Sequence, residues 1–419
     1  MNIDLNGKKI LLGVTGSIAA YKSCEIARLF IKAGASVQVV MSEAAQRFVS
    51  PLTFEALTRN KVLTKESESW ANNLNHIEIS KDCDIFLIAP ATANTINKIS
   101  KGIADNILLQ TVLAYNKPLV IAPAANTNML QSHYTQGSIK MIAVNDVTII
   151  KSQEKLLACG DEGNGALAEP IEIFWESSKI LLKDTFWENR RVVVTGGGTQ
   201  EKIDDVRFIS NHSSGKMANS IATALHLKGA DVCLITTAPT DDIPASIYTI
   251  KVESADEMYD YTKDALRVAR KGVMSKPSLN NPDAIGPIQK EPYLFMVAAV
   301  ADYTPTYPQE GKLKKSTLGE SWTLELKQTI DILSNIDKTG IKTVAFKAEM
   351  DSENGLQNAT NLLQFKKVDA VCYNLLKSSK SFGTDTNEIT WIKDGKQIEL
   401  GKKEKLSLAF DILNQAKDI

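Results

Sequence analysis

The chain has 419 residues, 43% of them hydrophobic and 23% charged, with a formal net charge of -1. This length favours two or three domains of ordinary globular composition. The near-zero charge argues against a nucleic-acid partner, and no apolar run is long enough to predict a membrane span. The five cysteines are widely spaced and form no CxxC pair or metal pattern, so we expect a cytoplasmic protein.

The first half of the chain alternates strand-like and helix-like runs. Apolar runs at residues 8–16, 36–42, 83–91 and 117–124 predict strands, and the first is followed by a helix that ends at Gly34. Short strands separated by helices favour a parallel sheet covered on both faces. Because such sheets bind ligands beyond the carboxyl ends of their strands, the polar residues after each run are the candidate site.

Two of these strand ends have the composition of a ligand site. Gly16 and Ser17 lie where a backbone turn and a helix start can accept an anion. Their spacing is not the dinucleotide fingerprint, and a tight turn without a ligand gives the same pattern. Residues 92–95, Thr-Ala-Asn-Thr, are small or polar, which favours a planar ligand over a plain helix cap.

Three more residues of the first half are candidates for chemistry. His76 precedes the strand at 83–91 and is either a general base or a structural histidine. Asn126 lies at another polar strand end. Cys159 lies in the glycine-rich residues 157–170, where a mobile thiol serves better as an acid than as a buried hydrophobe.

From Arg190 onward the chain repeats the strand–turn–helix–strand pattern of its first residues. Residues 190–199 repeat the strand and glycine turn, and residues 213–239 repeat the helix, the Gly-Ala helix end and the next strand. We therefore expect a boundary within residues 178–190, with domains at 1–183 and 184–419. Residues 268–292 interrupt the pattern with proline and asparagine and predict a surface insertion.

The polar stretch ISNHSSGKMA, residues 209–218, is not a Walker A loop. Ser210 and Met217 stand where that motif requires glycine and Ser/Thr. A helix start capped by Ser213 or Ser214 still favours an anion there. An anionic ligand also needs positively charged side chains nearby. For these we favour the K-x-K-K cluster at residues 312–315 over Lys216, although such lysine clusters usually lie on a solvated surface.

These motifs together resemble a known family. The stretches at residues 13–22, 75–80, 89–106, 123–129 and 158–165 resemble, in this order, the flavin-dependent cysteine decarboxylases. The whole chain outside 268–292 resembles the bifunctional phosphopantothenoylcysteine decarboxylase/phosphopantothenate–cysteine ligase family of coenzyme A biosynthesis. In the second half the family pattern is matched by Asp205, Arg207, Ile209, Ser210 and Asn211. The resemblance implies an α/β fold of two doubly wound Rossmann-like domains, a flavodoxin-like flavoprotein domain and a ligase domain.

For the first domain the resemblance implies an FMN-dependent decarboxylase. His76 would be the base near the substrate thiol, Asn126 would hold the carboxylate, and Cys159 would protonate the enethiolate product. The cofactor supplies the redox step while the protein orients and gates. FMN would rest on Gly16, Ser17, Ser42, Thr92, Ala93 and Asn94.

For the second domain the resemblance implies ligation of cysteine to 4′-phosphopantothenate through an acyl-cytidylate made from CTP, which releases pyrophosphate. Lysines and Mg²⁺, the latter held mainly by phosphates, would offset the triphosphate charge, with Lys312 as a catalytic cation. Asn211 would hold the acyl intermediate. CTP would contact Asp302, Lys312, Phe346 and Lys366. A homo-oligomer, a dodecamer with flavin sites between subunits, is also implied.

The chain departs from the family pattern at a few positions. Ala125 stands where relatives have methionine, Ala166 where many have arginine, and Ala218 where they usually have glycine. Leu362 replaces a lysine one helical turn before Lys366. We therefore expect an altered wall in the decarboxylase pocket and one nucleotide contact fewer in the ligase.

Two other functions fit part of the sequence. Two glycine-turn units also suit a nicotinamide oxidoreductase, but neither half contains G-x-G-x-x-G. A flavin-binding regulatory subunit without catalysis is the second alternative. Retention of His76, Asn126 and Cys159 argues against it.

Overall fold

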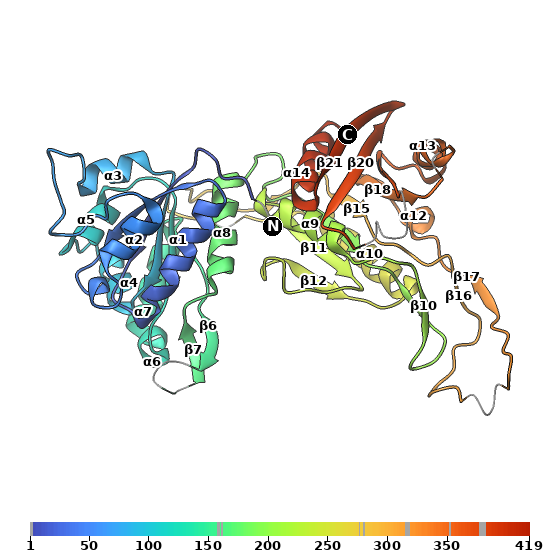
Figure 1. Cartoon of the computed structure of the whole chain (residues 1–419), viewed down its shortest axis with the longest axis horizontal. Coiled ribbons are helices and arrows are strands. Elements are labelled where there is room, and N and C mark those ends of the chain that lie inside the picture. The colour runs from blue at the N-terminus through green and yellow to red at the C-terminus, as the bar shows by residue number, and fades with distance from the viewer. Residues whose placement is uncertain are drawn as a thin grey trace. The chain divides into compact units, whose positions relative to one another are not determined.

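A computed structural model describes residues 3–156, 160, 162–275, 277–279, 281–314, 319–351, 353–376 and 383–419. The chain forms two compact units (Figure 1). The N-terminal unit comprises residues 3–182 and 275–286, and the C-terminal unit comprises residues 183–274 and 287–419. None of the helices in the described part of the chain has the length and apolar composition that a membrane span requires.

The N-terminal unit is built on a five-stranded parallel sheet in the order β2-β1-β3-β4-β5. This is the flavodoxin-like order, which confirms the predicted fold of the first half. The central strand β3 is buried along its whole length because helices cover both faces of the sheet. The strands are β1 (Lys9–Val14), β2 (Ser36–Met41), β3 (Ile85–Ala91), β4 (Leu119–Pro123) and β5 (Thr148–Ile149).

The helices of this unit connect and cover these strands. The first, α1, ends as predicted, because Gly34 follows it with a φ of +90°, a left-handed conformation that favours glycine. The helices are α1 (Lys22–Lys32), α2 (Pro51–Thr58), α3 (His76–Asp82), α4 (Ala93–Ser100), α5 (Ile107–Ala114), α6 (Thr127–Gln131), α7 (His133–Val144) and α8 (Pro170–Leu182), with a 3₁₀ turn, η1 (Ile18–Tyr21), before α1.

A hairpin of β6 (Gln153–Leu156) and β7 (Glu162–Ala166) leaves the sheet and returns beside the start of α6. Two glycines make this approach possible. A Cβ on Gly163 would lie 2.1 Å from Thr127 Oγ1, and one on Gly165 would lie 2.1 Å from the Ala125 carbonyl oxygen. Gly163 and Gly165 therefore let β7 lie directly against the loop that carries Asn126.

The C-terminal unit is built on an eight-stranded sheet, β12-β11-β8-β15-β18-β19-β20-β21. Its first six strands are parallel and, numbered along the chain, have the order 3-2-1-4-5-6, which confirms the predicted doubly wound fold. The last two strands are antiparallel, an addition that we did not predict. The strands are β8 (Arg191–Gly196), β11 (Asp231–Thr236), β12 (Tyr248–Lys251), β15 (Tyr293–Met296), β18 (Lys342–Glu349), β19 (Ala370–Leu375), β20 (Thr386–Lys393) and β21 (Lys396–Glu404).

Helices and two small hairpins complete this unit. The hairpins, β9–β10 and β16–β17, leave the main sheet after β8 and after β15. The remaining elements are β9 (Gln200–Lys202), β10 (Phe208–Ser210), α9 (Lys216–Leu227), α10 (Ala255–Ala269), β16 (Tyr303–Pro305), β17 (Leu326–Gln328), α12 (Ile332–Asn335), α13 (Gly355–Lys366) and α14 (Lys405–Gln415).

The predicted insertion is shorter than its sequence pattern indicated. Helix α10 continues to Ala269, and β13 (Val273–Met274) pairs with β14 (Pro287–Ile288). Only residues 275–286, between these strands, group with the N-terminal unit. Within that unit, Leu279 N donates to the Val144 carbonyl oxygen at 2.9 Å, and Ser278 Oγ donates to Asp146 at 3.0 Å.

Candidate functional site

The predicted flavin residues lie at one edge of the N-terminal sheet. Because β2, β1, β3 and β4 are parallel neighbours, the segments after them share the carboxyl edge. Thr15 joins two of these segments. Its Oγ1 donates to the Pro90 carbonyl oxygen at 2.7 Å and accepts from Thr92 N at 3.0 Å. Ser42, the Gly16–Ser17 turn, residues 92–94 and Asn126 therefore follow adjacent strands.

This edge has the close approaches and helix starts that an anionic planar cofactor needs. A Cβ on Gly16 would lie 2.4 Å from the Ala44 Cβ, so only glycine lets the Ser42 loop pack here. Ser17 caps η1 and Thr92 caps α4, so two helix starts lie at this edge. Asn94, at the second position of α4, is exposed beside the buried Ala93. The residues present fit FMN.

His76 is the first residue of α3, and its imidazole is held by an acidic partner. Its Nδ1 lies 2.7 Å from Glu68 Oε1, and both side chains are about three-quarters buried. The Trp70 ring meets the imidazole edge to face at 5.7 Å. With the carboxylate accepting the Nδ1 proton, Nε2 is left as the basic nitrogen. No local sequence signal pointed to Glu68, because the pair is made by a turn of the chain.

The structure does not bring His76 and Asn126 together within one chain. Helix α3, which begins at His76, lies at the opposite end of the N-terminal unit from α6 and the β6–β7 hairpin (Figure 1). Asn126 precedes α6 and caps it, since its Oδ1 accepts from Asn128 N at 2.9 Å. Cys159 lies outside the described residues.

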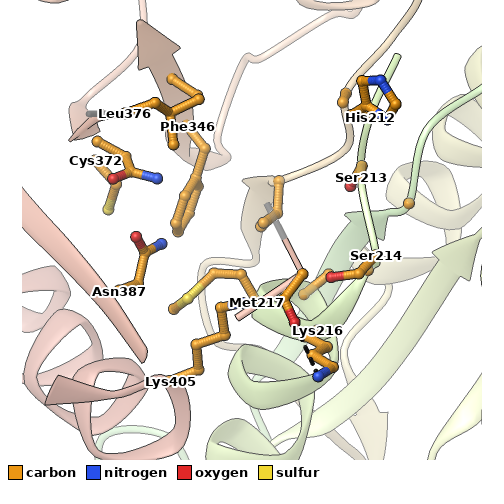
Figure 2. A pocket seen from close by; sticks show the side chains of 18 of the residues that line it. His212, Ser213, Ser214, Lys216, Met217, Phe346, Cys372, Leu376, Asn387 and Lys405 are labelled. Carbon is orange, nitrogen blue, oxygen red and sulfur yellow. Dashed lines mark hydrogen bonds between the residues drawn. The ribbon is translucent and has the colours of Figure 1, made fainter. Parts of the chain in front are cut away.

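The C-terminal unit contains a cavity of about 150 Å³ at the carboxyl ends of its central strands (Figure 2). The strand order reverses between β8 and β15, the point at which doubly wound sheets bind ligands. One wall is Phe346 and the buried Cys372, whose pKa burial raises well above its usual value. The cavity is lined further by Gly197, residues 212–218, Val297, Ala299, residues 347–348, Asn374, Leu376, Gly383, Asn387 and Lys405.

Three successive glycines let the 209–218 stretch reach this cavity. A Cβ on Gly196 would lie 2.5 Å from the Ala218 Cβ, and one on Gly198 would lie 2.4 Å from the Asn211 carbonyl oxygen. Gly197 between them has a φ of +80°. The backbone of β8 and the start of α9 are therefore in direct contact, and the extra methyl of Ala218 fits because Gly196 opposes it.

The predicted side-chain cap of this helix is wrong. Helix α9 begins at Lys216, and its N-cap is Gly215, which adopts a φ of +71° and makes no side-chain cap hydrogen bond. The left-handed turn at Gly215 takes the place that Ser213 or Ser214 would need. The first backbone N–H groups of α9 are therefore without a side-chain cap at the cavity wall, where they can bind an anion.

Two lysines line the cavity beside this helix start. Lys216 Nζ lies 2.6 Å from Asp385 and 3.0 Å from the Gly383 carbonyl oxygen. Lys405 is buried and donates to the Thr384 carbonyl oxygen, and burial and the nearby Lys216 lower its pKa. Both lie in the lower part of the view in Figure 2. The sequence ranked Lys216 below the 312–315 cluster and gave no signal for Lys405.

Of the predicted ligase residues, Phe346 lines this cavity, and Asn211, Asp302, Lys312 and Lys366 are not among its lining residues. Phe346 is in its wall, and Asn211, just before it, donates from Nδ2 to the Val300 carbonyl oxygen at 2.9 Å. Asp302 is exposed after β15. Lys312 is exposed in the β16–β17 loop, and its side chain bonds no residue that the structure describes. Lys366 is held by Asp331 and Ser334 and does not line the cavity.

Arg207 pairs with Asp204. It does not pair with Asp205, the aspartate that the sequence analysis matched to the family pattern. Arg207 donates to Asp204 Oδ2 from Nε at 3.0 Å and from Nη2 at 2.5 Å. These bonds hold the pKa of Asp204 well below its usual range. Asp205 is exposed, and its carboxylate accepts from Gly311 N.

Family models match both halves of the chain. Residues 2–180 match the model described as Flavoprotein, and residues 187–276 and 284–419 match the DNA/pantothenate metabolism flavoprotein C-terminal domain. The gap in the second match falls within the segment at 275–286 that groups with the N-terminal unit. The two models together cover nearly the whole chain.

Curated relatives match over their full length. The coenzyme A biosynthesis bifunctional proteins CoaBC of Bacillus subtilis and Haemophilus influenzae are each 36% identical, over 98% and 99% of this chain and 97% and 98% of theirs. The Escherichia coli protein of the same name is 30% identical over 96% of each chain.

Solved structures match one half each. A PPC decarboxylase mutant complexed with pantothenoylaminoethenethiol is 33% identical, with a TM-score of 0.38, and covers 41% of this chain and 96% of its own. The C-terminal domain of a CoaBC protein is 29% identical, with a TM-score of 0.40, and covers 55% and 95%. With full-length relatives and both family models in agreement, the chain belongs to the family of bifunctional coenzyme A biosynthesis enzymes, in which a flavoprotein decarboxylase domain precedes a ligase domain.

Proposed function

We propose that the C-terminal unit joins cysteine to 4′-phosphopantothenate with CTP, and that the N-terminal unit decarboxylates the product with FMN to give 4′-phosphopantetheine. The observation that carries the proposal is the cavity at the β8–β15 switch point. An uncapped helix start and two lysines there suit a triphosphate, and Phe346 supplies an apolar wall for a base.

In the ligase step, a carboxylate oxygen of 4′-phosphopantothenate attacks the α-phosphorus of CTP, and the bond to the β-phosphate oxygen breaks. Pyrophosphate leaves and an acyl-cytidylate forms. Lys312, Lys216 and Lys405 offset the negative charge that develops on the phosphates. Mg²⁺ would be held mainly by those phosphates.

Asn211 would then hold the acyl-cytidylate while the amine of cysteine attacks its acyl carbon and CMP leaves. The contact of its amide with the Val300 carbonyl oxygen holds the side chain against the segment that follows β15. Asp302 lies two residues further along and would contact CTP with Phe346. Lys366 is the member of the predicted set with the least support, because Asp331 and Ser334 already hold its ammonium group.

In the decarboxylase step, bound FMN supplies the oxidation and re-reduction of the substrate. It would rest on Gly16, Ser17, Ser42, Thr92, Ala93 and Asn94, all of which follow adjacent strands. His76 would accept the thiol proton at Nε2, and Asn126 would orient the carboxylate that is lost as carbon dioxide. Cys159 would return a proton to the enethiolate.

A complete decarboxylase site on this proposal needs two copies of the chain. Helix α3, with His76, lies away from the Asn126 loop in each copy (Figure 1). A homo-oligomer in which one copy supplies His76 and its neighbour supplies Asn126 brings the two residues to one substrate. We propose a cytoplasmic dodecamer as the assembly, with no nucleic-acid partner.

One incubation tests the proposed function. The purified chain with bound FMN, 4′-phosphopantothenate, cysteine, CTP and Mg²⁺ should yield 4′-phosphopantetheine, carbon dioxide, pyrophosphate and CMP. Equal support by ATP would contradict the nucleotide assignment. A colourless protein that takes up no FMN would contradict the decarboxylase, and equal carbon dioxide release by Cys159→Ser would refute the role of Cys159.

The Glu68–His76 pair predicts a specific effect on decarboxylation. Glu68→Gln should lower the rate about ten- to a hundredfold, because the imidazole loses the carboxylate that fixes its tautomer. Carbon dioxide release from phosphopantothenoylcysteine measures this. Glu78→Gln, in the helix that begins at His76 and paired with Lys81 at 2.9 Å, is the control and should behave as wild type. An unchanged rate in Glu68→Gln would contradict the role of the pair.

The cavity lysines predict a ranking of CTP affinities. Lys216→Ala should raise the KM for CTP about tenfold, since a charged contact to phosphate is lost. Lys366→Ala should raise it less, because Lys366 is held outside the cavity. Initial rates of pyrophosphate release against CTP concentration give both values. The opposite order would show that Lys366 swings to the nucleotide and Lys216 stays with Asp385.

A further inference from the structure

The turn of the β9–β10 hairpin holds the loop that carries Lys312. Asp204 Oδ2 accepts from Leu313 N at 3.1 Å, and Arg207 Nη2 donates to the Leu313 carbonyl oxygen at 3.0 Å. Asp205 Oδ2 accepts from Gly311 N at 2.7 Å. Both neighbours of Lys312 are therefore fixed by a segment more than a hundred residues earlier in the chain.

This turn is itself rigidly built around the Asp204 carboxylate. The side chain has no exposed surface, and its Oδ1 accepts from Val206 N at 2.9 Å and from Arg207 N at 2.7 Å. A buried carboxylate with this many charged and backbone donors has one strongly preferred position. The Arg207 guanidinium also lies 5.7 Å from the Trp322 ring, on the returning arm of the Lys312 loop.

The hairpin is in turn held by the segment that joins β12 to α10. In β9, Gln200 N donates to the Glu253 carbonyl oxygen at 2.8 Å, and the buried Glu201 accepts from Ala255 N at 2.9 Å. The other strand, β10, leads directly to Asn211. The two hairpins lie side by side (Figure 1), so one small structure fixes the positions of both Asn211 and the Lys312 loop.

We propose that Asp204, Asp205 and Arg207 are positioning residues for Lys312 in cytidylyl transfer. They hold the loop so that its ammonium group meets the CTP phosphates while Asn211 meets the acyl group. Lys312 needs such anchoring because the connection between β16 and β17 spans residues 306–325. A lysine in so long a connection is poorly preorganised unless other residues hold it. The inference rests on the proposed role of Lys312 in the ligase.

The test compares full-length variants, each with FMN bound. Asp204→Asn should lower kcat for CTP-dependent pyrophosphate release about tenfold, with a smaller change in KM. Asp205→Ala should have a weaker effect in the same direction. The control is Asp264→Asn in α10, which breaks the exposed Asp264–Arg267 pair. This pair has the same three-residue spacing as Asp204–Arg207, and its loss should change neither kcat nor KM. Decarboxylation by the N-terminal unit should stay constant in all three, and the melting temperature of the chain reports on folding of the C-terminal unit.

A double-variant comparison separates positioning from general structural support. In a Lys312→Ala background, Asp204→Asn should cause no further fall, since the lysine that it positions is gone. A fall of the same size in both backgrounds, or no fall in either, would overturn the proposal. If Asp204→Asn does not fold, the exposed Asp205→Ala gives the same comparison.

A readout without catalysis keeps this inference distinct from the proposed function. If the wild-type chain releases no pyrophosphate from CTP, the ligase assignment fails while the anchoring of the loop is still measurable. Trypsin should then cut after Lys312 several-fold faster in Asp204→Asn than in wild type or Asp264→Asn, because the released backbone fits the protease. Equal cutting rates would overturn the anchoring.

Discussion

Replacing Lys312 with alanine should lower CTP-dependent pyrophosphate release about a hundredfold, a loss typical of a group that stabilises charge in the transition state. Lys312 is exposed, and its side chain forms no hydrogen bond or ion pair with a described residue, so the substitution breaks no bond of that kind within the described part of the chain. The loss should therefore appear in kcat without a change in melting temperature. A quenched-flow or coupled pyrophosphate assay with saturating CTP measures it.

Two controls come from the same chain. Lys327→Ala, in β17 of the same hairpin, removes an exposed lysine outside the proposed site and should leave the rate unchanged. Decarboxylation of added phosphopantothenoylcysteine should be equal in both variants, since it takes place in the other unit. A rate within a factor of about two of wild type in Lys312→Ala would remove this residue from the mechanism and transfer its role to Lys216 and Lys405.

Co-expression of His76→Ala and Asn126→Ala chains should restore decarboxylation that neither variant shows alone. If each site takes His76 from one copy and Asn126 from a neighbour, random assembly leaves about one quarter of the sites with both residues intact. The placement of α3 away from α6 in each copy is the structural reason. Carbon dioxide release per bound FMN, from mixed oligomers purified with two different tags, gives the fraction.

The matched control is a chain that carries both substitutions, co-expressed with His76→Ala. No copy in that mixture has an intact His76, so it should stay inactive whatever the arrangement. Activity in the first mixture that is no greater than in this control would show that each copy builds its own site. In that case α3 must move towards the Asn126 loop when FMN and substrate bind.

Much of the architecture was predictable because its signals are local. The apolar runs that became β1, β2, β3 and β4 need only neighbouring residues to favour a buried strand. Gly34 and Gly229 both adopt a φ of +90° after their helices, which makes the repeated Gly-Ala helix ends readable from composition alone. The Asp394–Gly395 pair between β20 and β21 carried an equally local hairpin signal, but we did not use it.

The details of the sites were less predictable because they depend on turns and on tertiary packing, which leave no periodic signal in the sequence. Glu68 meets His76 through a turn, and Lys405 reaches the Lys216 side of the cavity from a helix near the C-terminus. Gly215, which adopts a left-handed turn beside Ala238 and Gly197, stands at the N-cap position in place of the predicted serine. None of these contacts leaves a pattern in a short window of sequence.

The sequence by itself determined the two α/β domains, the polar strand ends and the exclusion of a Walker loop, since periodicity, glycine conformation and motif spacing are local properties. Only the tertiary structure decided that Lys216 and Lys405 line the cavity, that Lys366 is held by Asp331, and that Asp204 anchors the Lys312 loop. The physical reason is that a side chain's partners are set by how strands and hairpins pack, which brings together residues more than a hundred positions apart.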